Sequence, residues 1–93
     1  MGHGAIDVEI HPNALKHLSR GQVESAWRSV TKSIRRESDD EPPRWLCIGW
    51  LPGGAAVELV AVDLMGGWLI IHGNSPVQKK FSAEMDRRER RAR

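Results

Sequence analysis

The sequence predicts an α+β domain: a small antiparallel β-meander sheet with two N-terminal helices and one C-terminal helix packed on it. Two observations lead to this class. Nearly continuous apolar runs joined by glycine turns occupy residues 44–72, and apolar residues at helical spacing occur on both sides of that region. Because 93 residues can form only one core, we expect a single domain over residues 1–93.

The chain begins with a short strand pattern. In "AIDVEIH", Ile6, Val8 and Ile10 alternate with polar residues, which is typical of a half-buried strand. "HPNALKHL" then predicts a first short helix, with Pro12 at the first helical position, where proline is tolerated. We expect residues 1–4 to be a cloning remnant or a disordered end, and we assign no function to His3.

A second helix is predicted from residue 20 onward. Ser19 and Gln22 have the spacing of a capping box, in which each side chain accepts a hydrogen bond from the other residue's backbone N–H. Apolar residues then recur at helical spacing: Val23, Trp27, Val30 and Ile34. The helix should end before Asp39, because "SDDEPP" is a cluster of residues that break helices.

The middle of the chain predicts three strands. "RWLCIGWL", "AAVELVAVDL" and "WLIIH" are short apolar runs joined by "PGG" and "MGG". Their length, their valine, isoleucine and tryptophan content and the glycine turns favour strands over helices. Two tight turns in succession predict an antiparallel meander.

The last segment predicts a basic helix. Ser75 is a candidate N-cap with Pro76 at the first helical position, and Val77, Phe81 and Met85 form one apolar stripe. We expect residues 86–93 to be an exposed basic tail. From Lys79 to Arg93 there are seven Lys and Arg against three Asp and Glu, a net charge of +4. This charge indicates a solvated face, a polyanion partner or an acidic protein partner.

Composition excludes several classes of site. A single cysteine, Cys47, permits no internal disulfide, and mid-strand it is expected to be buried and inert. The histidines lack the spacing of metal ligands, so we expect neither a metal nor another cofactor. No run approaches the roughly 20 apolar residues that span a bilayer, so we expect no membrane association and a cytoplasmic location.

Three ionisable residues stand out within the apolar meander: Arg44, which opens its first strand, Glu58 and His72. Glu58, between Val57 and Leu59, would cost several kcal/mol if buried unpaired, so it must face water or a cation. His72 ends a strand, and an imidazole changes charge near neutral pH. Glu58 and His72 are each interpreted either as an ordinary surface group or as an acid–base group. A three-residue loop between their strands would place them on one face and a two-residue loop on opposite faces.

The order of these segments resembles a known family. "IHPNALKHLSRGQVESAW" followed by "RWLCIGWLPGGAAVELVAVDLMGGWLIIHGNSPVQKKF" is similar to BrnT-type toxins of the RelE-like superfamily of small bacterial ribonucleases. The resemblance covers roughly residues 6–85. It lies in the lysine–histidine pair at the end of the first helix, the capped second helix, the meander and the basic last helix. Leu18 stands where the family commonly has glycine, and lysines open the last helix where the family often has arginines.

The resemblance implies a toxin of a bacterial type II toxin–antitoxin system that cleaves RNA by metal-independent acid–base chemistry. It implies RNA and a cognate antitoxin protein as partners. The candidate catalytic residues are His72, Glu58, Arg44 and Lys80, with His17 in reserve, and the candidate RNA contacts are Lys16, Lys79, Arg20, Arg87 and Arg88. The alternatives are a non-catalytic nucleic-acid- or protein-binding module, and an inactivated toxin-like protein kept for its protein contacts.

Overall fold

The computed structural model describes residues 7–92, so residues 1–4, with His3, lie outside it. The elements in chain order are strand β1 (Asp7–Ile10), 3-10 helix η1 (Pro12–Leu15), helix α1 (Arg20–Arg28), strands β2 (Lys32–Arg35), β3 (Arg44–Trp50), β4 (Ala56–Asp63) and β5 (Gly67–Asn74), and helix α2 (Lys79–Ala92). The class is α+β. No helix within residues 7–92 combines the length and the apolar character needed to cross a membrane.

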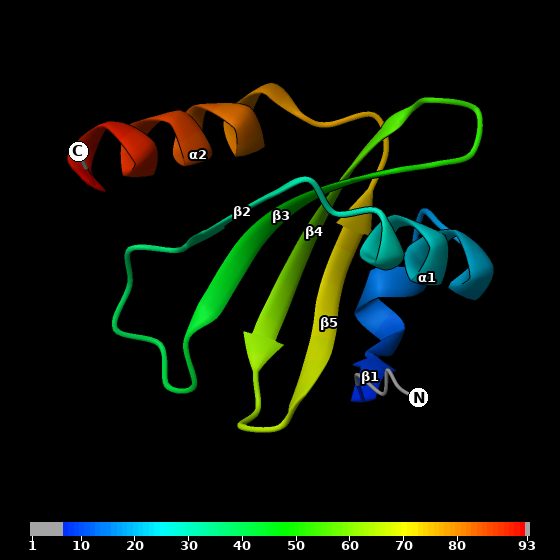
Figure 1. The fold of residues 1–93 in the computed structure, drawn as a ribbon, viewed down its shortest axis with the longest axis horizontal. Coiled ribbons are helices and arrows are strands. Elements are labelled where there is room, and N and C mark those ends of the chain that lie inside the picture. The colour runs from blue at the N-terminus through cyan, green and yellow to red at the C-terminus, as the bar shows by residue number, and fades with distance from the viewer. Residues whose placement is uncertain (1–6, 93) are drawn as a thin grey trace.

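The strands form one mixed sheet in the order β1-β5-β4-β3-β2 (Figure 1). The predicted meander corresponds to β3, β4 and β5, which are antiparallel neighbours. The prediction of a wholly antiparallel sheet is wrong, because β1 pairs with β5 in parallel. These two strands are joined by most of the chain rather than by a tight turn, so no turn forces them to be antiparallel.

The prediction of two N-terminal helices is also wrong. The first is a single 3-10 turn after His11, whose Nδ1 accepts a hydrogen bond from the Asn13 N–H at 3.0 Å. The second has the predicted capping box of Ser19 and Gln22 but ends at Arg28, and β2 replaces its last turns. At this boundary the Ser29 hydroxyl oxygen lies 3.0 Å from the Ser25 carbonyl oxygen and 2.9 Å from that of Trp50 in β3.

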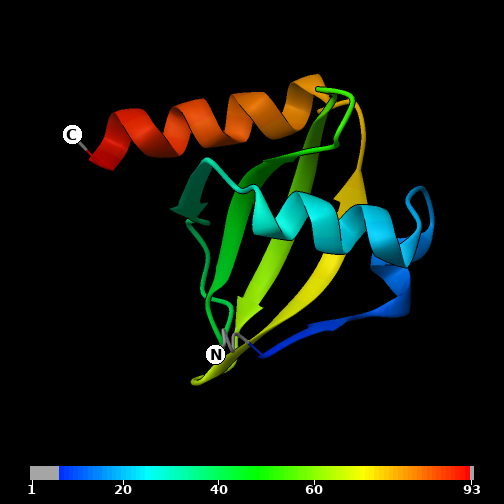
Figure 2. The ribbon, with the colours of Figure 1, turned by 45° about the vertical axis from the view of Figure 1, so that its right-hand side comes forward.

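The helices cover opposite faces of the sheet. Helix α1 and η1 pack on one face, where the buried residues are Ile10, Ala14, Leu18, Val23, Ala26, Cys47, Val57, Leu59, Ala61 and Ile70. Helix α2 packs on the other through Phe81 and Met85, which contact Leu46 and Val60. Figure 2 shows α1 crossing the sheet and α2 at its upper edge.

Glycine lets α1 approach the sheet closely. A Cβ atom on Gly49 of β3 would lie 2.1 Å from the backbone oxygen of Ala26, far inside any permitted contact. Ala26 is fully buried at this crossing. Any side chain at residue 49 would therefore push α1 away from β3.

Helix α2 begins at Lys79, three residues after the predicted start. The Ser75 hydroxyl donates a hydrogen bond to the Ala56 carbonyl at 2.7 Å, so Ser75 fastens the preceding loop to β4 rather than capping the helix. The helix continues to Ala92 and so includes residues 86–92, where a basic tail was predicted. The start of α2 therefore lies beside β4 and β5.

Candidate functional site

A β-bulge places Glu58 and His72 on the same face of the sheet. Val60 pairs with His72, but Ala61 pairs with Ile70, so Ile71 is an extra residue in β5. Had the register of the β4–β5 turn continued, Glu58 would pair with Gly73 and His72 would point to the α1 face. The extra residue instead places Glu58 opposite Asn74 and turns His72 toward the α2 face. This bulge, rather than the turn alone, settles the question that the sequence left open.

Glu58 is a buried carboxylate with both oxygens hydrogen-bonded. Glu58 is 1% exposed. Oε1 accepts a hydrogen bond from the backbone N–H of Gln78 at 2.6 Å, and Oε2 lies 2.7 Å from Nε2 of His72. These contacts offset the cost of burying the charge, and they tie β4 to β5 and to the start of α2.

His72 is the exposed partner of this pair. Its side chain is 40% exposed, and Nε2 is the ring nitrogen that contacts Glu58. A carboxylate at Nε2 favours the tautomer that carries its proton there, so the lone pair of a neutral ring lies on Nδ1. Nδ1 makes no hydrogen bond within residues 7–92 and is the nitrogen that a ligand can reach.

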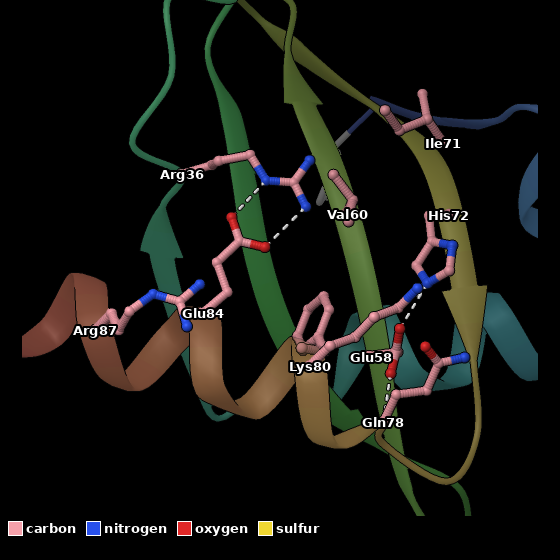
Figure 3. A pocket seen from close by; sticks show the side chains of 10 residues that line it. Arg36, Glu58, Val60, Ile71, His72, Gln78, Lys80, Glu84 and Arg87 are labelled. Atoms are coloured by element: carbon pink, nitrogen blue, oxygen red, sulfur yellow. Dashed lines mark hydrogen bonds and ion pairs between the residues drawn. The ribbon is translucent and has the colours of Figure 1, made fainter.

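The pair lines an open cleft of about 540 Å³ between the sheet and α2 (Figure 3). The lining residues are Arg36, Glu58, Val60, Ile71, His72, Gln78, Lys80, Phe81, Glu84 and Arg87. Figure 3 shows Lys80 extending from α2 toward the imidazole of His72. Lys80 and Arg87 make no hydrogen bond or ion pair with the other residues of the 7–92 region, so their charges are available to an anion.

Arg36 and Glu84 form the far wall of the cleft. Nε of Arg36 lies 2.8 Å from Oε2 of Glu84, and its terminal nitrogen Nη2 lies 3.2 Å from Oε1. This two-point contact joins the end of β2 to α2 and neutralises both groups. The cleft therefore presents an imidazole and two uncompensated cations.

The cleft continues into a smaller hollow of about 170 Å³ along α2, lined by Glu37, Glu84, Arg87, Arg88 and Arg91. Arg88 donates from Nε to the Arg35 carbonyl at 3.0 Å, and Arg91 forms an ion pair with Glu37. The Arg91 guanidinium holds the pKa of the Glu37 carboxyl below its usual value, first through its hydrogen bond and then through its charge.

The structure brings together four of the residues predicted to form a site: His72, Glu58, Lys80 and Arg87. The other six predicted residues lie outside the cleft. Arg44 forms an ion pair with Asp40 at 3.6 Å. Lys79 is the exposed first residue of α2, and Arg88 lines only the smaller hollow.

The remaining predicted residues lie at the other face of the sheet. Lys16 and His17 are exposed in the turn between η1 and α1, and Arg20 is the exposed first residue of α1. Their elements pack on the face opposite the cleft, so they cannot act together with His72.

Three polar residues of the cleft were not identified from the sequence as site residues: Arg36, Gln78 and Glu84. Arg36 follows β2, which was predicted to be helix, and Gln78 contributes through its backbone N–H. Glu84 sits one helical turn after Lys80 on α2, a spacing that places both residues on one side of a helix. This spacing was the one signal in the sequence that could have identified Glu84.

The cleft can hold an anion and exchange a proton at Nδ1 of His72. Within residues 7–92, no three His, Cys, Asp or Glu side chains are grouped as metal ligands. The thiol of Cys47 is on the other face, where burial raises its pKa to about 11, so it is a protonated and inert group at neutral pH.

Comparisons of this chain with protein-family models, with curated proteins and with solved structures found no match.

Proposed function

We propose that this protein binds RNA in the cleft and cleaves it by acid–base chemistry at His72, without a metal or a cofactor. The observation that supports this most is the half-exposed imidazole held by the buried carboxylate of Glu58, in a cleft with free cations. A buried carboxylate orients the ring and stabilises the imidazolium that forms when the ring takes a proton. Glu58 itself is too buried to touch a substrate.

The proposed reaction starts at the ribose 2′-hydroxyl. Nδ1 of neutral His72 takes the hydroxyl proton as the 2′-oxygen attacks phosphorus. Lys80 and Arg87 stabilise the extra negative charge of the pentavalent phosphorus. The bond from phosphorus to the 5′-oxygen then breaks, and water in the open cleft protonates the leaving oxygen. The products are a 2′,3′-cyclic phosphate and a 5′-hydroxyl.

The test is cleavage of end-labelled RNA by the purified protein, with and without EDTA. We expect cleavage in both conditions, a 2′,3′-cyclic phosphate product, and a loss of about 10²- to 10⁴-fold in rate for His72→Ala. His17→Ala is the matched control, because this exposed histidine lies at the other face of the sheet. Equal cleavage by His72→Ala and the unchanged protein would refute the proposal.

The resemblance to BrnT-type toxins supports a biological role for this activity. We propose that the protein acts in the bacterial cytoplasm as a toxin of a type II toxin–antitoxin system and that an acidic antitoxin chain neutralises it. Expression should then arrest growth, and His72→Ala should relieve the arrest at equal protein level. If both proteins arrest growth, the toxicity does not depend on the proposed chemistry at His72.

The second candidate is a non-catalytic nucleic-acid-binding module. It is favoured by the arginines along α2 and by the fact that His72 is the only imidazole among the residues that line the cleft. Such a module would bind RNA without cleaving it, and its affinity would fall steeply with salt. Binding that is weakened in Arg87→Gln, without product from any RNA, would favour this candidate.

A further inference from the structure

A second cavity lies on the α1 face of the sheet. Helix α1 has only nine residues, and Figure 2 shows β4 and β5 extending well beyond it. Beside the end of α1 is a cavity of about 440 Å³, lined by Trp27, Val30, Ser33, Trp45, Cys47, Asp63 and Trp68. Three of the four tryptophans of the chain thus meet at one place.

The indole rings are steeply inclined to one another. The ring centres of Trp27 and Trp68 are 5.6 Å apart with an angle of 56° between the planes. Those of Trp45 and Trp68 are 6.4 Å apart, with an angle of 85°. Rings at such angles form separate walls rather than a stack. All three are only partly buried, so their surfaces remain in contact with solvent.

Asp63 supplies a negative charge to this aromatic site. It pairs with Trp68 across β4 and β5, which places both side chains on the α1 face. Its Oδ1 accepts a hydrogen bond from the Met65 N–H at 3.2 Å. Within residues 7–92 it forms no ion pair, and it is the only charged residue that lines the cavity.

The Trp45 indole also has an unusual feature. Its Nε1 is buried without a hydrogen-bond partner in the region that the structure describes. An unpaired buried donor has lost its hydrogen bond to water without replacing it, so this position of the ring lowers the stability of the fold. Two residues that line the cavity thus carry a polar group without a matching partner within residues 7–92: the Trp45 N–H without an acceptor and the Asp63 charge without a cation.

We propose that the cavity binds an organic cation whose ammonium group is fully alkylated. Such a cation is weakly hydrated, is attracted to the faces of indole rings and is complementary to the charge of Asp63. A hydrated metal ion fits poorly, because Asp63 is the single carboxylate lining the cavity and the Cys47 thiol is protonated. The site is independent of the proposed RNA cleft, since it lies on the opposite face of the sheet.

The test compares choline with 3,3-dimethylbutan-1-ol, which has the same shape but no charge. Both are titrated into the ¹⁵N-labelled protein, and the indole N–H signals are followed by NMR. We expect choline to bind about tenfold more tightly than the alcohol, with shifts of the Trp27, Trp45 and Trp68 signals. Trp50 is the internal control, because its Nε1 donates to the Thr31 hydroxyl at 2.9 Å outside the cavity.

Two variants separate charge from apolar contact. Asp63→Asn keeps an oxygen for the Met65 N–H but removes the charge, and Trp68→Phe removes the central indole. We expect each to weaken choline binding several-fold, whereas the matched control Trp50→Phe binds normally. Equal affinity for choline and the alcohol, or no binding of choline at millimolar concentration to protein with a native spectrum, would overturn the proposal. Tight binding of choline that Asp63→Asn leaves unchanged would overturn the role of the carboxylate.

Discussion

The two faces of the sheet are closed by different kinds of contact. On the α1 face, small and fully buried residues let the helix touch the strands, as the contact between Gly49 and Ala26 shows. On the α2 face, only Phe81 and Met85 are buried among residues 79–91 of the helix. There, ion pairs from α2 to Lys32 of β2 and to Arg36 beside it add to the apolar contacts. The first arrangement stabilises the fold, and the second leaves room for an open cleft with polar walls.

The largest effect should come from adding a side chain where α1 touches β3. Gly49→Ala places a methyl group 2.1 Å from a backbone oxygen that cannot move without shifting α1. We expect a loss of about 3 kcal/mol or more in the free energy of unfolding, measured with urea. Gly53→Ala is the matched control, because no atom lies within 4 Å of the added Cβ. Similar stability of the two variants would contradict the close packing of α1.

The next effect should come from the buried carboxylate on the α2 face. Glu58→Gln retains the shape but replaces a charged acceptor of two hydrogen bonds with an amide. We expect the protein to lose about 1–3 kcal/mol of stability and, if it cleaves RNA as proposed, to lose that cleavage as well. Glu9→Gln is the control, since Glu9 is exposed. Unchanged unfolding in Glu58→Gln would mean that Glu58 is not buried in this network.

A smaller effect is expected where α2 meets β2. Arg36→Met removes a two-point contact with Glu84 whose partners are 27% and 31% exposed. Lys32→Met removes a single, more exposed contact with Glu89. In urea unfolding we expect Arg36→Met to lose about 1 kcal/mol of stability and Lys32→Met at most about 0.5 kcal/mol. Both losses should be smaller in 1 M salt. An equal loss for the two variants would contradict the difference in burial and geometry.

At neutral pH the smallest effect is that of the Cys47 thiol, whose ionisation changes stability only in alkali. Burial raises the pKa of Cys47 from 9.0 to about 11. The folded state therefore keeps this proton more tightly, so stability is retained below pH 9 and falls as the pH rises from about 9 to about 11. The difference in the free energy of unfolding between the unchanged protein and Cys47→Ala, measured with urea, should change with pH only in this range. Parallel curves would show that the thiol titrates alike in both states.

Local signals in the sequence predicted some of these features. The capping box of Ser19 and Gln22 was predicted because it depends on only four residues. Strand β2 was missed because Val30 and Ile34 continue the helical spacing of Val23 and Trp27. In the structure, Ile34 pairs with Leu46 and packs on the α2 face instead. Tertiary pairing prevailed over the local pattern.

The candidate site was harder to predict than the capping box, because it depends on tertiary structure. The sequence indicated that Glu58 must face water or a cation, but in the structure it is buried against a backbone N–H and an imidazole. No residue pattern marks the bulge at Ile71, although this bulge decides which face His72 occupies. Arg36 enters the cleft only because β2 is a strand. Several residues of the site were recognisable in the sequence, but the bulge and the strand that bring them to one face were not.

The most direct test of the account is the state of the His72 ring in solution. Long-range ¹H–¹⁵N NMR at neutral pH should show a slowly exchanging, downfield proton on Nε2, held by the buried carboxylate of Glu58. In Glu58→Gln this signal should move upfield and exchange rapidly. A His72 ring with the same nitrogen shifts and proton exchange in both proteins would contradict the pairing on which the proposed site rests.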